Sequence, residues 1–373
     1  MTAMTDAQAL PDANAVTDAN APSRAFFFGG LLDPELPARI AKGRQPRADF
    51  LELLGRHPAR MVTFREVAAA ASPLVRLSRR LGGSYWGMAA LGRVQPGLTG
   101  ALTTGEDVGF PLALVQRLTG GSLPLGIITH GSHLGSRKGK WVLRLLRGAD
   151  HVHFLCLSES LKQRLIDVHH IPQSRVHNTG HGVDTRFFQP DSQKPPQPRL
   201  IASAGMANRD YQTLVAAVDG LDVEAKIAAD SAWFQSDLDI KGQMPSNVEA
   251  RSYGDYVGLR RLYGEAVCVV VPLYDAVHAC GYAVIAEAMA MGKPVITTRI
   301  AGCSDYLIEG ETGYYVPPGD ADALRARILQ LVEDPGLACR LGQNARRLIE
   351  EKHTLEATNG RIAAAMALAQ ETR

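Results

Sequence analysis

Short apolar runs recur along this chain, and segments with helical periodicity lie between many of them. In the first half, runs of strand length predict β-strands at 24–32, 59–64, 97–105, 124–131 and 151–158. Helical spacing of apolar residues is found between some of these runs, as in 109–120 and 158–170. Strands that alternate with helices in this way are typical of a mostly parallel, doubly wound sheet.

The alternation restarts in the second half. Further strands are predicted at 199–205, 223–229, 248–254, 267–273 and 295–298. Helical patterns are found at 211–220, 258–266, 281–292, 320–334 and 336–352. Asp320 is a suitable N-cap, and Pro335 followed by Gly336 separates the last two helices. The chain is therefore predicted to fold as two successive Rossmann-like α/β halves.

A polar, proline-rich stretch separates the two halves. It reads "PDSQKPPQP", residues 190–198, and is typical of a linker. It divides the chain into a first domain at 24–189 and a second at 199–354, with the active site expected in the cleft between them. Residues 1–23 have neither the basic start nor the apolar stretch of a secretory signal, and we expect a disordered tail.

Charge is unevenly distributed, although the formal net charge of the whole chain is only +2. Residues 1–190 hold 22 Lys and Arg against 14 Asp and Glu, a net of +8. The remainder holds 18 against 24, a net of −6. Opposite signs support two domains that have different partners.

The cysteine pattern indicates a reducing compartment. The five cysteines are scattered and none forms a CxxC pair, which argues against a disulfide framework or a zinc site. No apolar run approaches the roughly 20 residues that are needed to cross a bilayer. We therefore expect a cytoplasmic protein.

One helical pattern carries a carboxylate where burial is expected. In "CGYAVIAEAMAMGKPVITT", residues 280–298, Glu287 follows Gly281 by close to two turns among Ala, Val, Ile and Met. Burying an unpaired carboxylate is costly, whereas a pair of ribose hydroxyls would satisfy a group that only accepts hydrogen bonds. The N–H groups of a helix that begins after Gly281 favour a phosphate. The alternative is structural: Glu287 caps the helix or pairs with Lys293 or Arg299.

The second half resembles the donor domain of a GT-B glycosyltransferase, specifically the large retaining family 4. The similarity rests on "EAMAMGKPVI" (287–296), "GETGYYVPPGD" (310–320) and the turn "NTGHGVDTRFFQP" (178–190). The resemblance implies two Rossmann-like domains that face each other across a cleft, the first binding an acceptor and the second a nucleotide sugar. It implies that residues 355–373 form a helix that crosses back to the first domain. It also implies that Glu287 holds the ribose of the donor.

The loop before this helix matches the family only in part. Cys280, Gly281 and Tyr282 match a loop whose backbone N–H groups meet the sugar and the diphosphate. The family has a second glutamate eight residues before Glu287, beside the donor sugar, and this chain has Ala279 there. His278 and Asp275 are the candidate substitutes, if the loop is shifted.

A second donor contact is expected in "ASAGMANRDYQTL", residues 202–214, which resembles the family's glycine loop. Gly205 matches the glycine, and Arg209 is the best match to the lysine that binds diphosphate, with the same charge in a bidentate form. The arginine that usually follows the glycine is Met206 here. The alternative for Arg209 is a surface ion pair with Asp210 at a helix start.

In the first half, His130 in "ITHGSHLG" (128–135) follows an apolar strand. It matches the family's histidine near the donor sugar and the acceptor, and we predict that it polarises or positions a sugar hydroxyl. A structural role is the alternative, because histidine forms many kinds of hydrogen bond. Gly29 and Gly30 resemble the glycine loop that passes close to the diphosphate, although glycines also simply turn a chain.

The resemblance implies no metal and no tightly bound cofactor. The co-substrate would be a UDP- or GDP-sugar. The departing diphosphate would be stabilised by the helix N-terminus and by Arg209, with Lys293 and Arg299 as further candidate cations.

Residues 136–150, "SRKGKWVLRLLRGAD", form a basic amphipathic pattern that suits the surface of an anionic membrane. It places Trp141, Val142, Leu145 and Leu146 against four basic residues. The prediction is peripheral contact at the inner face of the membrane, and the alternative is a core-packing helix with a solvated basic face. Nucleic acid is not expected as a partner, because aromatic residues are few and no recognition motif is present.

The function predicted from these observations is retaining transfer of a hexose from a nucleotide sugar to an acceptor hydroxyl of a glycan, lipid or small molecule. One alternative is a nucleotide-sugar epimerase with the same fold. The other is a non-catalytic partner protein, which Met206 and Ala279 keep open because two usual donor contacts are missing.

Overall fold

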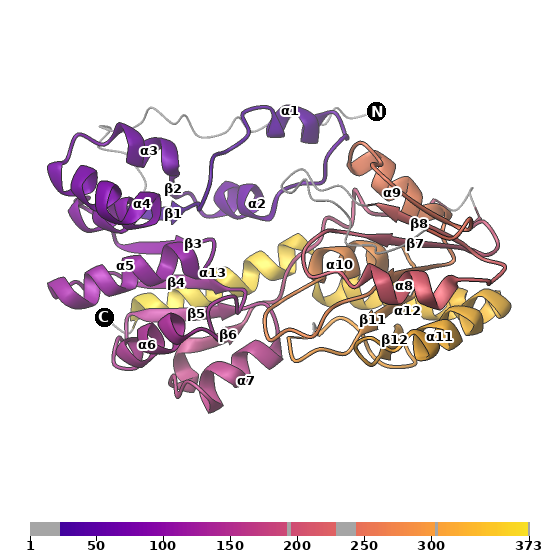
Figure 1. The fold of residues 1–373 in the computed structure, drawn as a ribbon. Helices are drawn as coiled ribbons and strands as arrows, with labels where there is room; N and C mark the ends of the chain where they lie inside the picture. The colour runs from indigo at the N-terminus through magenta and orange to yellow at the C-terminus, as the bar shows by residue number, and fades with distance from the viewer. Residues whose placement is uncertain (1–22, 192–194, 229–243, 303–304, 372–373) are drawn as a thin grey trace. The chain divides into compact units, whose positions relative to one another are not determined.

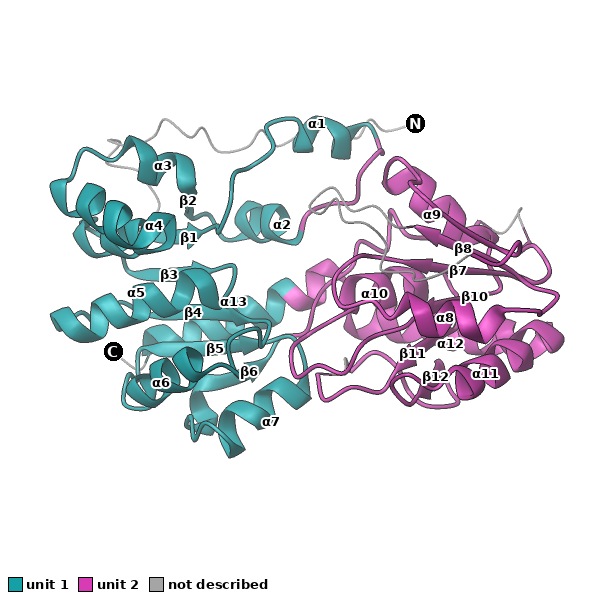
Figure 2. Cartoon of the chain, in the orientation of Figure 1, with its two compact units in different colours: residues 1–42, 49–179, 359–373 teal, residues 43–48, 180–358 magenta. Residues whose placement is uncertain are grey.

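The computed structural model describes residues 23–191, 195–228, 244–302 and 305–371. The predicted tail, up to residue 22, and residues 192–194 of the predicted linker lie outside the described residues. The chain divides into two compact units (Figure 2). Unit 1 contains residues 1–42, 49–179 and 359–373, and unit 2 contains residues 43–48 and 180–358.

Unit 1 is built on a parallel sheet with the strand order β2-β1-β3-β4-β5-β6 (Figure 1). Its strands are β1 (Arg24–Phe27), β2 (Arg60–Val62), β3 (Gly100–Thr103), β4 (Leu125–Thr129), β5 (Val152–Cys156) and β6 (Val176–Asn178). Five of them lie inside the runs predicted from the apolar pattern. The short edge strand β6 was not predicted, because its sequence, Val-His-Asn, contains no apolar run.

The helices of unit 1 connect successive strands. They are α1 (Leu36–Ala41), α2 (Asp49–Arg56), α3 (Phe64–Ala69), α4 (Pro73–Val94), α5 (Glu106–Thr119), α6 (Arg137–Leu146) and α7 (Glu159–Asp167). The first four were not predicted. Helix α1 buries no residue, and α4 is interrupted at Gly83, whose φ of 78° is not helical. Both features remove the regular apolar spacing by which a helix is found in a sequence.

Unit 2 repeats the plan with the strand order β12-β11-β10-β7-β8-β9. Its strands are β7 (Leu200–Ala204), β8 (Glu224–Ala228), β9 (Val248–Arg251), β10 (Cys268–Val271), β11 (Val295–Thr298) and β12 (Gly313–Val316). Renumbered within the unit, this is the 3-2-1-4-5-6 order of the Rossmann fold, whose order reverses between β7 and β10. A ligand is expected at that reversal, beyond the carboxyl ends of the strands.

Among its described residues, unit 2 contains five helices that lie within it alone, and two of their predicted starts can be compared with the structure. They are α8 (Tyr211–Val218), α9 (Tyr256–Glu265), α10 (Tyr282–Ala290), α11 (Ala321–Glu333) and α12 (Pro335–Lys352). Asp320 caps α11 by accepting a hydrogen bond from the N–H of Ala323 at 2.8 Å. Helix α11 ends before Pro335, which begins α12. These local predictions are confirmed.

The last helix, α13 (Leu355–Glu371), starts in unit 2 and continues in unit 1 from residue 359. In unit 1, its Ile362 and Ala365 join a buried apolar cluster with Phe26, Leu102 and Leu155 of the sheet. Burial of this apolar stripe explains why the end of the chain folds with the first half.

The units separate between Thr179 and Gly180, before the predicted linker. Residues 180–184 are held within unit 2, because Val183 forms a β-bridge with Thr354. Residues 43–48 join the same unit through Arg47, whose guanidinium donates to Asp184 at 2.8 Å and to Glu356 at 2.9 Å. The "GVD" turn, residues 182–184, is therefore held in place by Asp184.

The predicted fold class, two Rossmann-like doubly wound domains, is confirmed. No helix among the described residues is long and apolar enough to cross a membrane. The four described cysteines are free, three of them buried, and Cys303 lies outside the described residues.

Candidate active site

A cavity of about 590 Å³ opens in unit 2 at the point where the strand order reverses. It lies beyond the carboxyl ends of β7 and β10, between the loops that follow these strands and the start of α9. Of the residues predicted from the sequence, it is lined by Gly205, Arg209, His278, Cys280, Gly281, Tyr282 and Glu287. Met206 and Ala279, the two departures from the family pattern, line it as well.

Glu287 extends from α10 into this cavity and is only 9% exposed. Its Oε2 accepts a hydrogen bond from the hydroxyl of Tyr263 at 3.2 Å. Burial raises the pKa of Glu287 to about 8, although Tyr263 and the charge of Arg209 act in the opposite direction. The carboxyl group thus has the hydroxyl of Tyr263 as a partner, and burial still favours its neutral form.

Glu287 does not pair with Lys293 or Arg299, because each of these cations has another partner, and within the fold it is bonded to Tyr263. The ammonium of Lys293 donates to the carbonyl oxygen of Gly264 at 2.8 Å. Arg299 pairs with Glu309 at 3.3 Å and lies over the ring of Tyr315. Neither cation lines the cavity, so neither is positioned there to bind a diphosphate.

Helix α10 begins at the wall of the cavity. Its N-cap is Gly281, with a φ of 73°, and a Cβ at this position would lie 2.9 Å from the side chain of Val271. Glycine is therefore required both by the backbone and by the available space. The following Tyr282 is anchored by its hydroxyl, which donates to the carbonyl oxygen of Gly302 at 2.8 Å. Because Gly281 offers no side-chain acceptor, the first turn directs backbone N–H groups at the cavity.

Arg209 is held by backbone carbonyl groups and not by a carboxylate. Its Nε donates to Ala204 at 2.9 Å and its Nη1 donates to Ala207 at 2.7 Å. Gly205, with a φ of 95°, lies under the guanidinium, since a Cβ there would be 2.4 Å from Nη2. Asp210 caps α8 by accepting from the N–H of Thr213. The surface pair between Arg209 and Asp210 is thus wrong, and the guanidinium retains its charge beside the cavity.

The two departures leave the cavity with few charges. Met206 and Ala279 are apolar where the family has a cation and a carboxylate. His278 is in the lining and stands next to Ala279, whereas Asp275 is not in the lining. Of the two substitutes predicted, only His278 is placed to contact a ligand in this cavity.

Several lining residues were not predicted. Tyr253, Asp255 and Tyr256 border the cavity where β9 meets α9. Asp255 caps α9 and accepts a hydrogen bond from Arg44 at 2.9 Å. Burial, and then the charge of Glu287, raises the pKa of Tyr256 to about 12, so its hydroxyl stays protonated. An aspartate before a helical pattern is a cap signal, but the sequence contains no sign that this cap faces a cavity.

His130 lies in unit 1, directly after β4. Its Nε2 lies 3.0 Å from the carbonyl oxygen of Thr104, which can only accept, so this nitrogen carries the proton. The buried carboxylate of Glu106 fixes the turn by accepting from the N–H groups of His130 at 3.2 Å and Gly131 at 2.6 Å. The Nδ1 atom is then the acceptor, suited to position a hydroxyl. Glu106 was not predicted, because it follows a strand like many exposed acids.

Gly29 and Gly30 follow β1 at the same edge of the sheet of unit 1. The N–H of Gly29 donates to Thr104 Oγ1 at 3.0 Å, and a Cβ on Gly29 would lie 2.9 Å from Val108. Thr104 therefore joins the glycine loop to His130. The carboxyl ends of β1, β3 and β4 bring these predicted residues together, although they are far apart in the sequence.

Among the described residues, no group of three or more His, Cys, Asp or Glu side chains is arranged to hold a metal ion. The donor set of the cavity in unit 2, with Arg209, Glu287 and a helix N-terminus, instead offers hydrogen bonds to an anion and to hydroxyl groups.

Comparison with known proteins agrees with this description. Residues 243–348 match the family described as "Glycosyl transferases group 1", a region that includes Cys280, Gly281 and Glu287. The glycosyltransferase CapM of Staphylococcus aureus, of capsular polysaccharide biosynthesis, is 25% identical over 228 residues, which are 53% of this chain and 57% of that protein. The MMP alpha-(1->4)-mannosyltransferase of Mycolicibacterium hassiacum is 29% identical over 191 residues, 48% of this chain and 44% of that protein. The chain thus spans about half the length of these relatives.

Solved structures share the fold over nearly the whole chain. A sucrose-phosphate synthase from Thermosynechococcus elongatus superposes with a TM-score of 0.67 at 18% identity, covering 91% of this chain and 97% of its own. Anabaena HepE in complex with UDP and glucose also gives a TM-score of 0.67, at 16% identity, covering 92% of this chain and 99% of its own. At these identities the likeness defines the GT-B fold.

Proposed function

We propose that this protein is a glycosyltransferase that moves a hexose from a nucleoside diphosphate sugar to an acceptor hydroxyl with retention of configuration. The observation that supports this most strongly is the cavity at the strand reversal of unit 2. It combines a buried carboxylate, a guanidinium held over a glycine and a helix N-terminus, and the carboxylate and the helix lie in the region similar to group 1 glycosyl transferases.

The residues of the cavity suit the three parts of such a donor. When it is ionised, the carboxyl group of Glu287 accepts hydrogen bonds from the two ribose hydroxyls. Arg209 and the first turn of α10 bind the diphosphate. In the reaction, the bond from the anomeric carbon to the diphosphate oxygen breaks, a bond to the acceptor oxygen forms, and the acceptor hydroxyl passes its proton to an oxygen of the departing diphosphate. Negative charge grows on the departing diphosphate, where Arg209 and the helix N-terminus stabilise it.

His130 contributes from unit 1. With its Nε2 donating to Thr104, its Nδ1 accepts a hydrogen bond and positions a sugar hydroxyl. Glu106 is a positioning residue, because it holds the turn that carries the imidazole.

Titration calorimetry with UDP, GDP, ADP and TDP tests the donor site. We expect one diphosphate to bind clearly and to lose affinity in Glu287→Ala, while Glu333→Ala, on the exposed side of α11, binds normally. Mass spectrometry of the matching sugar conjugate should then show slow donor hydrolysis.

If no diphosphate binds at millimolar concentration, the apolar Met206 and Ala279 outweigh the likeness, and the protein is a non-catalytic partner. Formation of a free sugar epimer without an acceptor product would identify an epimerase.

A lipid-borne acceptor at the inner face of the membrane is the acceptor class we propose. In α6, Trp141 is 57% exposed beside basic residues, whereas Val142 and Leu146 face the core. In α4, the exposed leucines Leu74, Leu77 and Leu81 share one helical face. The 39 residues between Glu66 and Glu106 hold four arginines and no acid, which complements an anionic lipid surface.

This surface belongs to the edge of unit 1 where His130 lies. The ring of Tyr85, in α4 just after the break at Gly83, is 3.5 Å from where a Cβ of Gly29 would be. Gly29 in turn contacts Thr104, the partner of His130. A membrane held against the first part of α4 would therefore present lipid-borne hydroxyl groups near the histidine.

Sedimentation with lipid vesicles tests this contact. We expect the protein to bind vesicles containing phosphatidylglycerol, to bind pure phosphatidylcholine weakly, and to dissociate as salt rises. The double variant Leu77→Ser with Leu81→Ser should lose most of the binding. Leu118→Ser, which changes a 77% exposed leucine at the end of α5, is the matched control and should bind normally. If all variants bind the vesicles equally, or if the unchanged protein does not bind them, the proposed membrane contact is wrong.

A further inference from the structure

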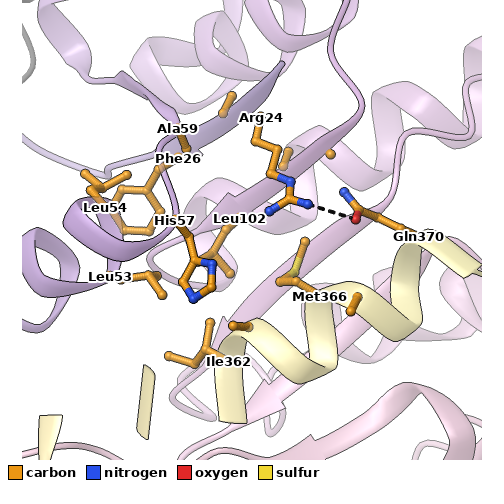
Figure 3. Close-up of a pocket in the computed structure, with 15 residues that line it drawn as sticks. Arg24, Phe26, Leu53, Leu54, His57, Ala59, Leu102, Ile362, Met366 and Gln370 are labelled. Atoms are coloured by element: carbon orange, nitrogen blue, oxygen red, sulfur yellow. Dashed lines mark hydrogen bonds between the residues drawn. The ribbon is translucent and has the colours of Figure 1, made fainter. Parts of the chain in front are cut away.

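A second cavity, of about 280 Å³, lies in unit 1 between α2 and α13 (Figure 3). Strands β1 and β3 form its back wall. Its apolar lining includes Phe26, Leu53, Leu54, Leu102, Ile362 and Met366. Five of these side chains belong to one buried core cluster and the sixth, Met366, packs against it, so the cavity is a gap in this core.

The gap follows from how α13 packs. Met366 can approach the sheet closely at Gly126 of β4, where a Cβ would lie 2.3 Å from its sulfur. This contact draws α13 onto β4 and β5. Helix α2 is only eight residues long, and it packs near β1 on the side of the cavity opposite to α13. The space over β1 and β3 is then left between the two helices.

The rim of this cavity is polar and basic. Figure 3 shows Arg24 and Gln370 side by side, with Arg24 Nη2 donating to Gln370 Oε1 at 3.2 Å, and His57 nearer to Leu53 and Ile362. The lining residues include no Asp or Glu. Within the described residues, the guanidinium of Arg24 has a neutral amide and no carboxylate as its recorded partner. An anionic group at the rim would thus meet a cation that is already positioned.

The cavity is distinct from the site that contains His130. Arg24 and Gly100 are the first residues of β1 and β3, whereas Gly29 and His130 follow the last residues of β1 and β4. In a parallel sheet these are opposite edges. A molecule in this cavity therefore occupies neither the donor cavity nor the place proposed for the acceptor.

We propose that this cavity binds a single-chain carboxylate of medium length, such as a free fatty acid of about eight to ten carbons. The apolar walls take the chain, and Arg24 takes the carboxylate. The volume is roughly twice that of a cavity of about 150 Å³ that accepts benzene, and close to the lower limit of small-molecule sites. A membrane lipid with two chains would not fit.

Calorimetry with hexanoate, octanoate and decanoate, each below its micellar concentration, tests the proposal. We expect one molecule to bind each chain, and the affinity to rise about fourfold for each added methylene until the cavity is full. Octan-1-ol has the same chain without the charge and should bind more weakly than octanoate. Arg24→Gln should lower the affinity for octanoate about tenfold and leave that for octan-1-ol unchanged.

Two neighbouring substitutions separate this cavity from surface binding. Ala363→Phe fills it, because Ala363 is part of the lining, and should abolish binding. Ala364→Phe adds the same ring at the next, exposed position of α13 and should leave the affinity unchanged. Circular dichroism and the melting temperature show that both variants are folded. Absence of binding to the unchanged protein, or equal binding by both variants, would overturn the proposal whatever the outcome of the nucleotide titrations.

Discussion

Replacing Glu287 with glutamine is expected to stabilise the folded chain and to weaken its affinity for a nucleoside diphosphate. The buried carboxyl group has a pKa of about 8, against an ordinary value of 4.5. At pH 7 it is mostly neutral in the folded state and ionised in the unfolded state, which favours unfolding by about 3 kcal/mol. Glutamine has no proton to gain, and it can keep the hydrogen bond from Tyr263.

The sign of the pH dependence follows from the raised pKa. Below pH 4.5 the carboxyl group is neutral in both the folded and the unfolded state and does not favour unfolding. As the pH rises toward 8, the group ionises in the unfolded state while it stays largely neutral in the folded state, so the folded state loses stability. The advantage of Glu287→Gln in the free energy of unfolding should therefore be small at pH 5 and largest near pH 8. Affinity for the diphosphate should nonetheless fall about tenfold to a hundredfold, since an amide replaces a charged acceptor.

Urea denaturation at pH 5, 6, 7 and 8 measures the first effect, and calorimetry at pH 8 measures the second. The exposed control Glu333→Gln should change the free energy of unfolding by less than about 0.5 kcal/mol at every pH. An advantage for Glu287→Gln that does not grow with pH would contradict the account of the buried carboxyl group. A stabilised variant that still binds the diphosphate normally would show that Glu287 does not bind the donor.

The sequence predicted the donor half of the fold more completely than the first half, for a physical reason. Strands such as β10 are buried throughout, so they read as unbroken apolar runs, and the caps of α11 and α12 are local. In the first half, α4 turns leucines outward and breaks at Gly83, which removes the periodic signal. A helix whose apolar residues are exposed lacks the regular apolar pattern by which helices are predicted from a sequence.

The site shows the same division. Glu287 and Gly281 were found because a charge in an apolar helix and a glycine at its start are unusual within a short window. Tyr263 and Glu106 were not, since their importance depends on what lies across the fold. Lys293 and Arg299 were wrong as diphosphate ligands for the same reason: closeness in sequence to Glu287 does not fix the direction of a side chain, and both turn to other partners.

Replacing Arg209 with glutamine is expected to lower the affinity for the nucleoside diphosphate by about a hundredfold. Among the described lining residues, Arg209 is the one side chain with a permanent positive charge, because Met206 replaces the family's arginine. Charge-assisted, bidentate hydrogen bonds to phosphate are among the strongest polar contacts in proteins. Lysine keeps the charge but not the planar fork, so Arg209→Lys should lose about tenfold.

The parent nucleoside distinguishes binding of phosphate from support of the loop. Arg209 also holds the backbone through Ala204 and Ala207, so its loss costs stability of about 1–2 kcal/mol as well. If its role in the cavity is to bind phosphate, Arg209→Gln should weaken the diphosphate and change the affinity for the nucleoside less than twofold. Equal losses for both ligands would instead mean that Arg209 only shapes the loop. Arg299→Gln removes an exposed arginine outside the cavity and should alter neither affinity, which gives calorimetry a matched reference at equal net charge.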